Sequence, residues 1–129
     1  MLDFATLKLT WRPNQYLVAP RGLTPGAQPH RESPVFPLPA AALMERFKAH
    51  ALAQPRVTLL AEDKVAHKLE LVQRSAFFRF PDYISVEVVP DGDGRSTIAV
   101  YSRARYGIRD FGVNKARIDH WLAAVFGGA

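Results

Sequence analysis

The stretch YISVEVVPDGDGRSTIAVYSRA, residues 83 to 104, has the pattern of two β-strands joined by a tight turn. In the first half Ile84, Val86 and Val88 alternate with Ser85 and Glu87, which is the period of a strand with one buried face, and the second half places Ile98 and Val100 on one face of a strand. The DGDG between the halves, residues 91 to 94, is a hairpin turn signal. This stretch therefore predicts an antiparallel hairpin. The apolar residues expected on one face are Ile84, Val86, Val88, Ile98 and Val100.

Two more strands are predicted upstream of this hairpin. In RVTLLAED, residues 56 to 63, the alternation places Val57, Leu59 and Ala61 on one face. In AHKLELVQRS, residues 66 to 75, Leu69 and Leu71 alternate with Lys68 and Glu70. Three or four consecutive strands connected by short turns predict an antiparallel meander, of at least three strands, between residues 56 and 104.

Helical spacing of apolar residues flanks the meander on both sides. Residues 39 to 55 predict a helix that ends at Pro55, and NKARIDHWLAAVFGG, residues 114 to 128, predicts a second helix. Asn114 is the expected N-cap of the second helix and Gly127 its stop. The predicted apolar stripes are Leu43, Met44, Phe47 and Ala51 in the first helix and Ile118, Trp121, Leu122 and Val125 in the second. Together these elements predict an α+β fold, with helices packed on one face of an antiparallel β-meander.

The N-terminal part of the chain predicts extended structure followed by a long loop. Leu7, Leu9 and Trp11 alternate with polar residues, which favours a half-buried strand, and QYLVAP, residues 15 to 20, favours a further extended segment. Six prolines between residues 20 and 39 exclude a helix there. We expect Val35 and Phe36 to anchor this Pro-rich loop on the rest of the protein. The chain, residues 1 to 129, is expected to form a single domain that includes the loop.

Composition excludes several classes of site and leaves a preference for anionic partners. The 129 residues include no cysteine, which excludes disulfides, thiolate metal sites and a cysteine nucleophile. The first twenty residues lack the pattern of a signal peptide, and no apolar run approaches the ~20 residues of a membrane span, so cytoplasmic residence is the default expectation. The formal net charge of +5 favours a small anionic ligand or an acidic protein surface as partner.

The junction YSRARYGIRDFGVN, residues 101 to 114, concentrates the charged residues of most interest. On the last strand Arg103 and Arg105 are expected on one face, with Ser102 on the other. Gly107 and Gly112 permit a sharp turn from strand into helix. Asp110 precedes the helix and can accept bonds from loop amides or pair with Arg103 or Arg117.

Two interpretations of this junction are compatible with each other. The first is structural: an Arg-Asp-Asn network locks the last strand onto the last helix. Its members are Ser75, Asp82, Ser102, Gly107, Asp110 and Gly112. The second is functional: arginines converge near the helix N-terminus, where free amides and the helix dipole attract a phosphate or carboxylate. The predicted anion-binding residues are Arg74, Arg103, Arg105, Asn114 and Arg117. Of the two, we favour the structural interpretation over a ligand site.

An enzymatic alternative is a small hydrolase that uses Asp110 or Asp82, with an arginine stabilising the oxyanion. Ser75 and Ser102 do not lie in Gly-x-Ser-x-Gly and are not expected to be nucleophiles. The four histidines lack the spacing of metal ligands, so no metal site and no cofactor is predicted. These histidines are His30, His50, His67 and His120.

An aromatic run beside two arginines admits a nucleic-acid interpretation, because bases stack on aromatic rings while arginines contact phosphates. Phenylalanine is more often buried than stacked on a base, so we expect this run to belong to the core and predict no specific nucleic acid. The run comprises Phe77, Phe78, Phe80 and Tyr83, next to Arg74 and Arg79.

Three stretches resemble a family of bacterial and plastid proteins known as domain of unknown function 1499. They are RSAFFRFPDYISV (74 to 86), YSRARYGIRDFGVNKARIDHWL (101 to 122) and PNQYLVAP (13 to 20). The family pattern is Arg-Ser before Phe-x-Asp, then Ser-Arg-x-Arg-x-Gly, then Asp-x-Gly-Val-Asn with a downstream Arg. The matching positions are Arg74, Ser75, Phe80, Asp82, Ser102, Arg103, Arg105, Gly107, Asp110, Gly112, Val113, Asn114 and Arg117.

This chain departs from many relatives at Gln15, where a cysteine is common, so no role of that cysteine carries over. It also has Phe80-Pro81-Asp82 where a valine is common. The resemblance implies no particular reaction. The leading expectation is therefore a non-enzymatic binding or accessory protein with an arginine-lined anion site at the junction. The hydrolase is one alternative, and a purely structural network with the functional surface elsewhere is the other.

Overall fold

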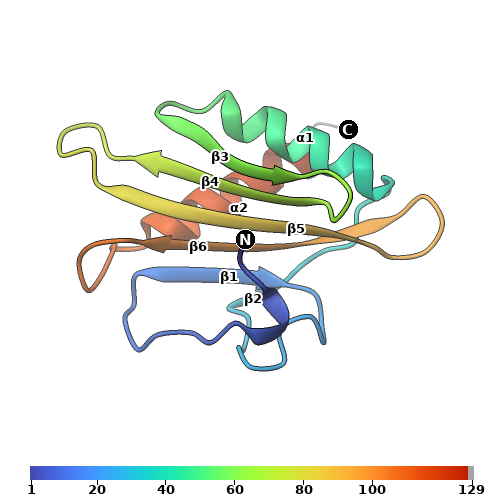
Figure 1. Ribbon diagram of the computed structural model, residues 1–129, viewed down its shortest axis with the longest axis horizontal. Coiled ribbons are helices and arrows are strands. Elements are labelled where there is room, and N and C mark those ends of the chain that lie inside the picture. Colours follow the sequence, from blue (N-terminus) through green and yellow to red (C-terminus); the bar gives the residue numbers. More distant parts are fainter. Residues whose placement is uncertain (128–129) are drawn as a thin grey trace.

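The computed structural model describes residues 1 to 127, which form one six-stranded sheet with the order β2-β1-β6-β5-β4-β3 (Figure 1). Strands β3 to β6 follow one another as an antiparallel meander, as predicted. Strand β1 continues the sheet antiparallel to β6 and pairs in parallel with the short β2. The strands are β1 (Gln15–Ala19), β2 (Arg31–Glu32), β3 (Val57–Asp63), β4 (Lys68–Arg74), β5 (Pro81–Pro90) and β6 (Ser96–Ala104).

Helices α1 (Ala40–Leu52) and α2 (Val113–Gly127) cover one face of this sheet; in Figure 1 α2 lies behind the strands and α1 lies beside β3 at the upper edge. Both predicted apolar stripes are buried against the inward-facing residues of the meander. The rings of Phe47 and Trp121 meet edge to face across the two helices, with centroids 6.0 Å apart. The predicted α+β class is thus confirmed. The prediction that Gly127 ends the second helix also concerns residues 128 and 129, which lie outside the described part of the chain.

The opposite face of the sheet is partly covered by the N-terminal segment, and the strand predicted around Leu7 and Trp11 is wrong. A short 3-10 helix, η1 (Phe4–Thr6), begins where the Asp3 carboxylate accepts a bond from the Ala5 N–H. Phe4 and Leu7 then pack across β1 and β6, while Trp11 is exposed. The segment around Leu7 and Trp11 does not form a strand, because β1 already pairs with the edge of β6. The segment therefore has no strand edge to pair with.

The Pro-rich loop contains no helix, as predicted, but it is held by more than its apolar residues. The His30 and Ser33 N–H groups donate to carbonyls of β1 at 2.9 and 3.0 Å, on either side of β2. Phe36 is fully buried and forms a bridge with Ser96. The anchoring role predicted for Val35 is wrong, because this side chain is 45% exposed.

A β-bulge in β3 makes one prediction wrong, namely that Ala61 lies on the same face as Val57 and Leu59. Leu59 lies opposite Leu71, but Ala61 lies opposite Glu70, so Leu60 is an extra residue in the strand. An inserted residue reverses the alternation beyond it, and Ala61 therefore faces away from Leu59. The bulge brings Glu62 to the helix side, where its carboxylate accepts a bond from Lys48 on α1 at 2.7 Å.

Candidate functional site

A cleft of about 920 Å³ opens at the end of the sheet that lies on the left in Figure 1. It lies between the β4–β5 turn (residues 75 to 80), the β6–α2 loop (residues 105 to 112) and the first turns of α2. Charged and aromatic side chains line it together. They are Arg56, Arg74, Asp82, Arg109, Asp110 and Arg117, with Phe80, Tyr106, Phe111, His120 and Trp121.

Arg117 on α2 connects the helix to the middle of the sheet at the base of this cleft. Its Nη2 lies 2.8 Å from Asp82 Oδ2 on β5, and its Nε donates to Gln73 Oε1 on β4 at 2.5 Å. Its Nη1 donates to Asn114 Oδ1 and to Ser102 Oγ on β6. The Arg117 and Asp82 side chains are only 10% and 16% exposed, so this ion pair is largely shielded from water. The fork of the guanidinium thus binds three strands at once.

Asn114 lies inside the first turn of α2, and the N-cap role predicted for it is wrong. Asp110 caps the helix instead: Oδ1 accepts from the Gly112 N–H at 2.9 Å, and Oδ2 accepts from the Asn114 N–H at 3.1 Å. Positive φ angles at Phe111 and Gly112 turn the chain so that Asp110 reaches these amides. Asp110 accepts bonds from loop amides, one of its two predicted roles, and within residues 1 to 127 it forms no ion pair with Arg103 or Arg117.

The buried Asn114 side chain occupies the centre of a polar network. Its Oδ1 accepts from Ser102 Oγ at 2.5 Å and from Arg117, while its Nδ2 donates to Asp110 Oδ2 at 2.6 Å. The same Nδ2 lies 3.2 Å from the carbonyl oxygen of Asn14. The network therefore connects β6, the loop before α2, the helix itself and the chain leading into β1.

Gly107 and Ser75 shape the backbone around the cleft. Gly107 adopts a φ of 85°, and its carbonyl accepts a bond from Asn14 Nδ2 at 2.7 Å. Ser75 Oγ accepts from the Phe80 N–H at 3.0 Å and closes the β4–β5 turn. Sequence reasoning missed Asn14 as part of this arrangement, although it lies in the PNQYLVAP stretch that carries the family resemblance.

Arg103 and Arg105 lie outside the cleft. As the alternation predicts, Arg103 lies on the sheet face opposite Ser102, where its Nη1 donates to Ser85 Oγ at 2.7 Å. Its guanidinium lies over the Tyr101 ring, and burial lowers the pKa of Arg103. Arg105 is exposed and lies over the Tyr106 ring. Of the five predicted anion-binding residues, Arg74 and Arg117 line the cleft, and Asn114 lies beneath it.

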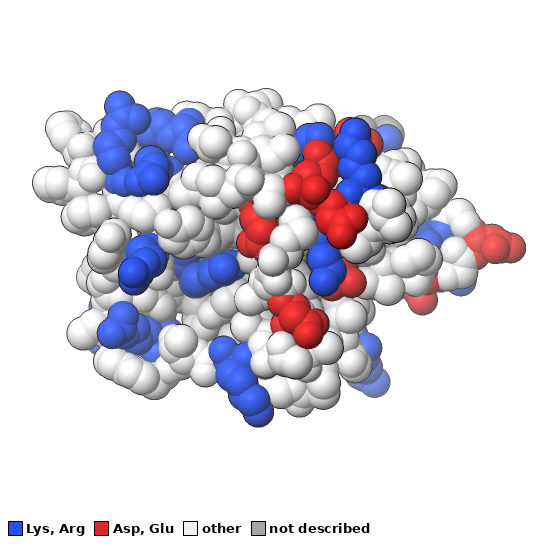
Figure 2. Space-filling model, viewed as in Figure 1, with Lys and Arg blue, Asp and Glu red and all other residues white. Residues whose placement is uncertain are grey.

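Positive charge exceeds negative charge in the cleft. Arg56 Nε and Arg74 Nη1 donate only to backbone carbonyls, at 2.8 and 3.0 Å, and within residues 1 to 127 Arg109 has no side-chain hydrogen bond. Asp82 is taken by Arg117, and both Asp110 oxygens accept N–H groups. Figure 2 shows arginine and lysine side chains at this end of the molecule, whereas acidic ones gather over the middle and the right.

The core position predicted for the aromatic run is wrong for its three phenylalanines. Phe77, Phe78 and Phe80 are exposed, with Phe77 at 92%, because the β4–β5 turn projects beyond the end of the sheet, where no element covers it. Tyr83 is partly buried on β5. The ring centroid of Phe80 lies 6.1 Å from that of Tyr106, and both rings line the cleft. The site therefore has an aromatic wall, and one of its members, Phe80, was predicted to lie in the core.

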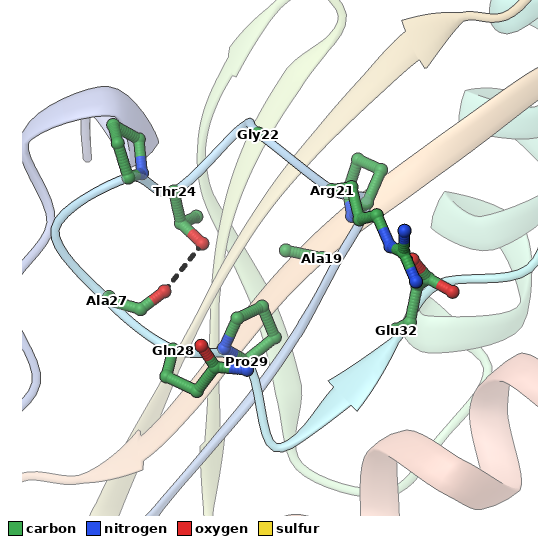
Figure 3. A pocket seen from close by; sticks show the side chains of 10 residues that line it. Ala19, Arg21, Gly22, Thr24, Ala27, Gln28, Pro29 and Glu32 are labelled. Atoms are coloured by element: carbon green, nitrogen blue, oxygen red, sulfur yellow. Dashed lines mark hydrogen bonds and ion pairs between the residues drawn. The ribbon is translucent and has the colours of Figure 1, made fainter.

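A second hollow, of about 420 Å³, lies inside the Pro-rich loop (Figure 3). Its two charged side chains, Arg21 and Glu32, pair with each other at 2.9 Å, and Thr24 Oγ1 donates to the Ala27 carbonyl at 2.8 Å. It therefore presents no unpaired charge to a ligand, and we place the candidate site in the cleft.

Strand β1 is joined to α2 by a separate charged cluster. Tyr16 Oη donates to Asp119 Oδ1 at 2.9 Å, and Arg31 and Lys115 contact the same carboxylate. Burial, together with the bond to Asp119, raises the pKa of Tyr16 from 10.0 to about 12. A raised folded-state pKa means that the stability contributed by Tyr16 is complete below pH 10 and is lost as the pH rises toward 12.

We expect Tyr16→Phe to flatten the fall in stability between pH 10 and pH 12, because this variant has no phenol to ionise there. Urea unfolding at a series of pH values measures the slope. Tyr106→Phe removes an exposed phenol and is the matched control. Equal slopes for the two variants would contradict the assignment.

Within residues 1 to 127, no three His, Asp or Glu side chains gather in a way that could hold a metal ion. Over the same residues, neither helix has the length and apolar character needed to cross a bilayer.

Several solved structures resemble this fold, and two of them illustrate the likeness. The crystal structure of Ara h 8.0201 superposes with a TM-score of 0.56 at 12% identity, over 75% of this chain and 93% of that chain. The di-domain ARO/CYC BexL from the BE-7585A biosynthetic pathway superposes with a TM-score of 0.54 at 14% identity, over 74% of this chain and 44% of that chain. At such identities the likeness shows the fold alone.

Sequence comparison gives one family. No curated protein matches the sequence. The profile of a family described as "Protein of unknown function (DUF1499)" matches residues 10–125.

Proposed function

Because the chain belongs to the DUF1499 family, whose description assigns no activity, we propose a function from the cleft itself. The protein is a non-enzymatic binding or accessory protein, and the cleft takes a small ligand that carries a carboxylate or phosphate next to an apolar or aromatic body. The arginines hold the anionic group, and the aromatic wall holds the rest.

The observation that carries this proposal is the excess of arginine beside exposed aromatic rings. Arg56, Arg74 and Arg109 have no carboxylate partner within residues 1 to 127. Phe80, Tyr106 and Phe111 form apolar walls a short distance away. A concave site with apolar walls and a few convergent polar groups is typical of small-molecule binding.

The state of the two aspartates favours binding over hydrolysis. A catalytic carboxylate must be free to accept a proton or attack the substrate. Asp82 is held by Arg117, and Asp110 by the helix amides and Asn114. His120 lies at the cleft but has no hydrogen-bonded carboxylate or hydroxyl partner within residues 1 to 127. The network of Asn114 and Arg117 supports the floor of the cleft, so a structural role of the network is compatible with ligand binding in the cleft.

We expect Arg109→Ala to weaken binding of 8-anilinonaphthalene-1-sulfonate, an aromatic sulfonate that mimics such a ligand, by roughly 10- to 100-fold. This range corresponds to one lost hydrogen bond to a charged group, worth about 1.5 to 3 kcal/mol. Arg109 makes no other side-chain hydrogen bond within residues 1 to 127, so the variant should keep its fold. Fluorescence titration measures the dissociation constant.

Arg95→Ala is the matched control, because it removes the same charge from the β5–β6 turn at the opposite end of the sheet. Equal affinities of the two variants would refute the cleft as the site. Competition by inorganic phosphate tests the anion requirement. Turnover of a p-nitrophenyl ester or phosphate that is lost in Asp110→Asn would favour the hydrolase instead.

A further inference from the structure

Three loops meet at the same end of the molecule and form a surface that we call the loop end. They are residues 10 to 14 before β1, residues 75 to 80 between β4 and β5, and residues 105 to 112 between β6 and α2. Asn14 Nδ2 donates to the Gly107 carbonyl at 2.7 Å, and the Arg105 N–H donates to the Pro81 carbonyl at 3.0 Å. The loop end is therefore one connected surface, at the left in Figure 1.

Large apolar side chains project from all three loops. The most exposed in each loop are Phe77 at 92%, Phe111 at 88% and Trp11 at 76%. An apolar surface of this kind, concentrated in one place, typically marks a contact with another molecule. The side chains involved are Trp11, Phe77, Phe78, Phe80, Tyr106, Ile108 and Phe111.

The charge of the loop end is almost entirely positive. Its arginines are Arg12, Arg79, Arg105 and Arg109, with Arg74 at the end of β4. The three loops contain a single acidic residue, Asp110, whose oxygens are bound to the N-terminus of α2. Projecting aromatic side chains and cationic ones thus share one surface. A matching partner has anionic groups at its surface, which pair with the arginines, and an apolar layer below them, which takes the aromatic rings.

We propose that the loop end docks on a membrane surface that contains anionic lipids. Phosphate headgroups match the arginines, and aromatic side chains are favoured at the boundary between headgroups and acyl chains. Phe77 and Phe78 lie at the tip of a projecting turn and do not line the cleft, so they are free to enter that boundary. The inference does not depend on the proposed ligand of the cleft.

Some rings of the loop end already have a neighbour on one face, which leaves less open ring surface for stacked bases and favours a bilayer over a single-stranded nucleic acid. Base stacking needs open aromatic faces. Phe78 and Phe80 already stack on each other, with centroids 5.4 Å apart and planes at 18°. The guanidinium of Arg12 lies over the Trp11 ring, 5.7 Å from its centroid. Insertion of these side chains into a bilayer interface requires no free ring face.

Co-sedimentation of the full chain with vesicles tests the proposal. We expect binding to vesicles of phosphatidylcholine with 30% phosphatidylglycerol, weaker binding at higher salt, and little binding to pure phosphatidylcholine. The Phe77→Ser, Phe78→Ser double variant should bind the anionic vesicles at least tenfold more weakly. Val65→Ser is the control, because Val65 is 93% exposed in the β3–β4 turn at the opposite end. Equal losses in the double variant and the control would overturn the proposal.

Intrinsic fluorescence gives a second readout. The two tryptophans differ in environment: Trp121 is 3% exposed and Trp11 lies at the loop end. Anionic vesicles should shift the emission to shorter wavelength, and Trp11→Phe should abolish that shift. Absence of vesicle binding, or binding of oligothymidine in place of vesicles, would overturn the proposal. Binding of anilinonaphthalene sulfonate without vesicles, measured on the double variant, reports on the cleft separately.

Discussion

Replacing Asp82 with alanine is expected to lower the free energy of unfolding by about 3 to 5 kcal/mol, the usual cost of leaving a buried charge without its partner. Arg117 is 10% exposed and has Asp82 as its carboxylate partner at 2.8 Å. In the variant its guanidinium keeps neutral partners, Gln73, Asn114 and Ser102, which cannot balance the charge. A loss of this size is a large fraction of the stability of an ordinary domain.

Urea unfolding followed by circular dichroism measures this loss. Glu32→Ala is the matched control, since it breaks an ion pair whose side chains are 92% and 58% exposed, and such pairs contribute about 1 kcal/mol or less. If Asp82→Ala unfolds within about 1 kcal/mol of the wild type, the Arg117–Asp82 pair does not hold the helix to the sheet.

Asn114→Ala is expected to cost about 3 kcal/mol, because each buried polar group left without a partner costs about 1 to 3 kcal/mol. The variant removes the acceptor of Ser102 and Arg117 and the donor to Asp110. It also removes the bond to the Asn14 carbonyl, which links α2 to the chain before β1. Thermal and urea unfolding measure the effect.

Asp110→Ala is the comparison for Asn114→Ala. It removes a helix cap, for which about 1 to 2 kcal/mol is typical. Asp110 has no arginine partner within residues 1 to 127, so its removal leaves no buried cation without a partner. A larger loss for Asp110→Ala than for Asn114→Ala would show that the cap, and not the asparagine, is the centre of the network.

The regular elements were predictable because their signal is local. Alternation in β4 and β5 and the stripe of α1 each required only that one face be buried. Leu7 to Trp11 carries the same alternation, but a strand also needs a partner edge, and β1 had taken it. The bulge at Leu60 likewise depends on the register with β4. Pairing between distant segments is not encoded in the period of a single segment.

The candidate site could likewise be predicted only in part. Asp82, Ser102, Asn114 and Arg117 were predicted as members of motifs, and they lie in one network. Their partners were not predictable, since the distance between residues 82 and 117 depends on the packing of α2 on the sheet. Apolar character suggested burial for Phe77, but a turn that projects from the sheet has nothing to pack against.

The bulge at Leu60 in β3 also affects how copies of this chain can associate through the edges of their sheets. Strand β3 lies at one edge of the sheet, where unpaired N–H and C=O groups can recruit a strand from another molecule. Leu60 interrupts the regular spacing of those groups midway along the edge. The opposite edge is β2, only two residues long. Neither edge offers a long regular strand for another molecule to pair with. The folded chain is therefore protected from aggregation by edge-to-edge strand pairing.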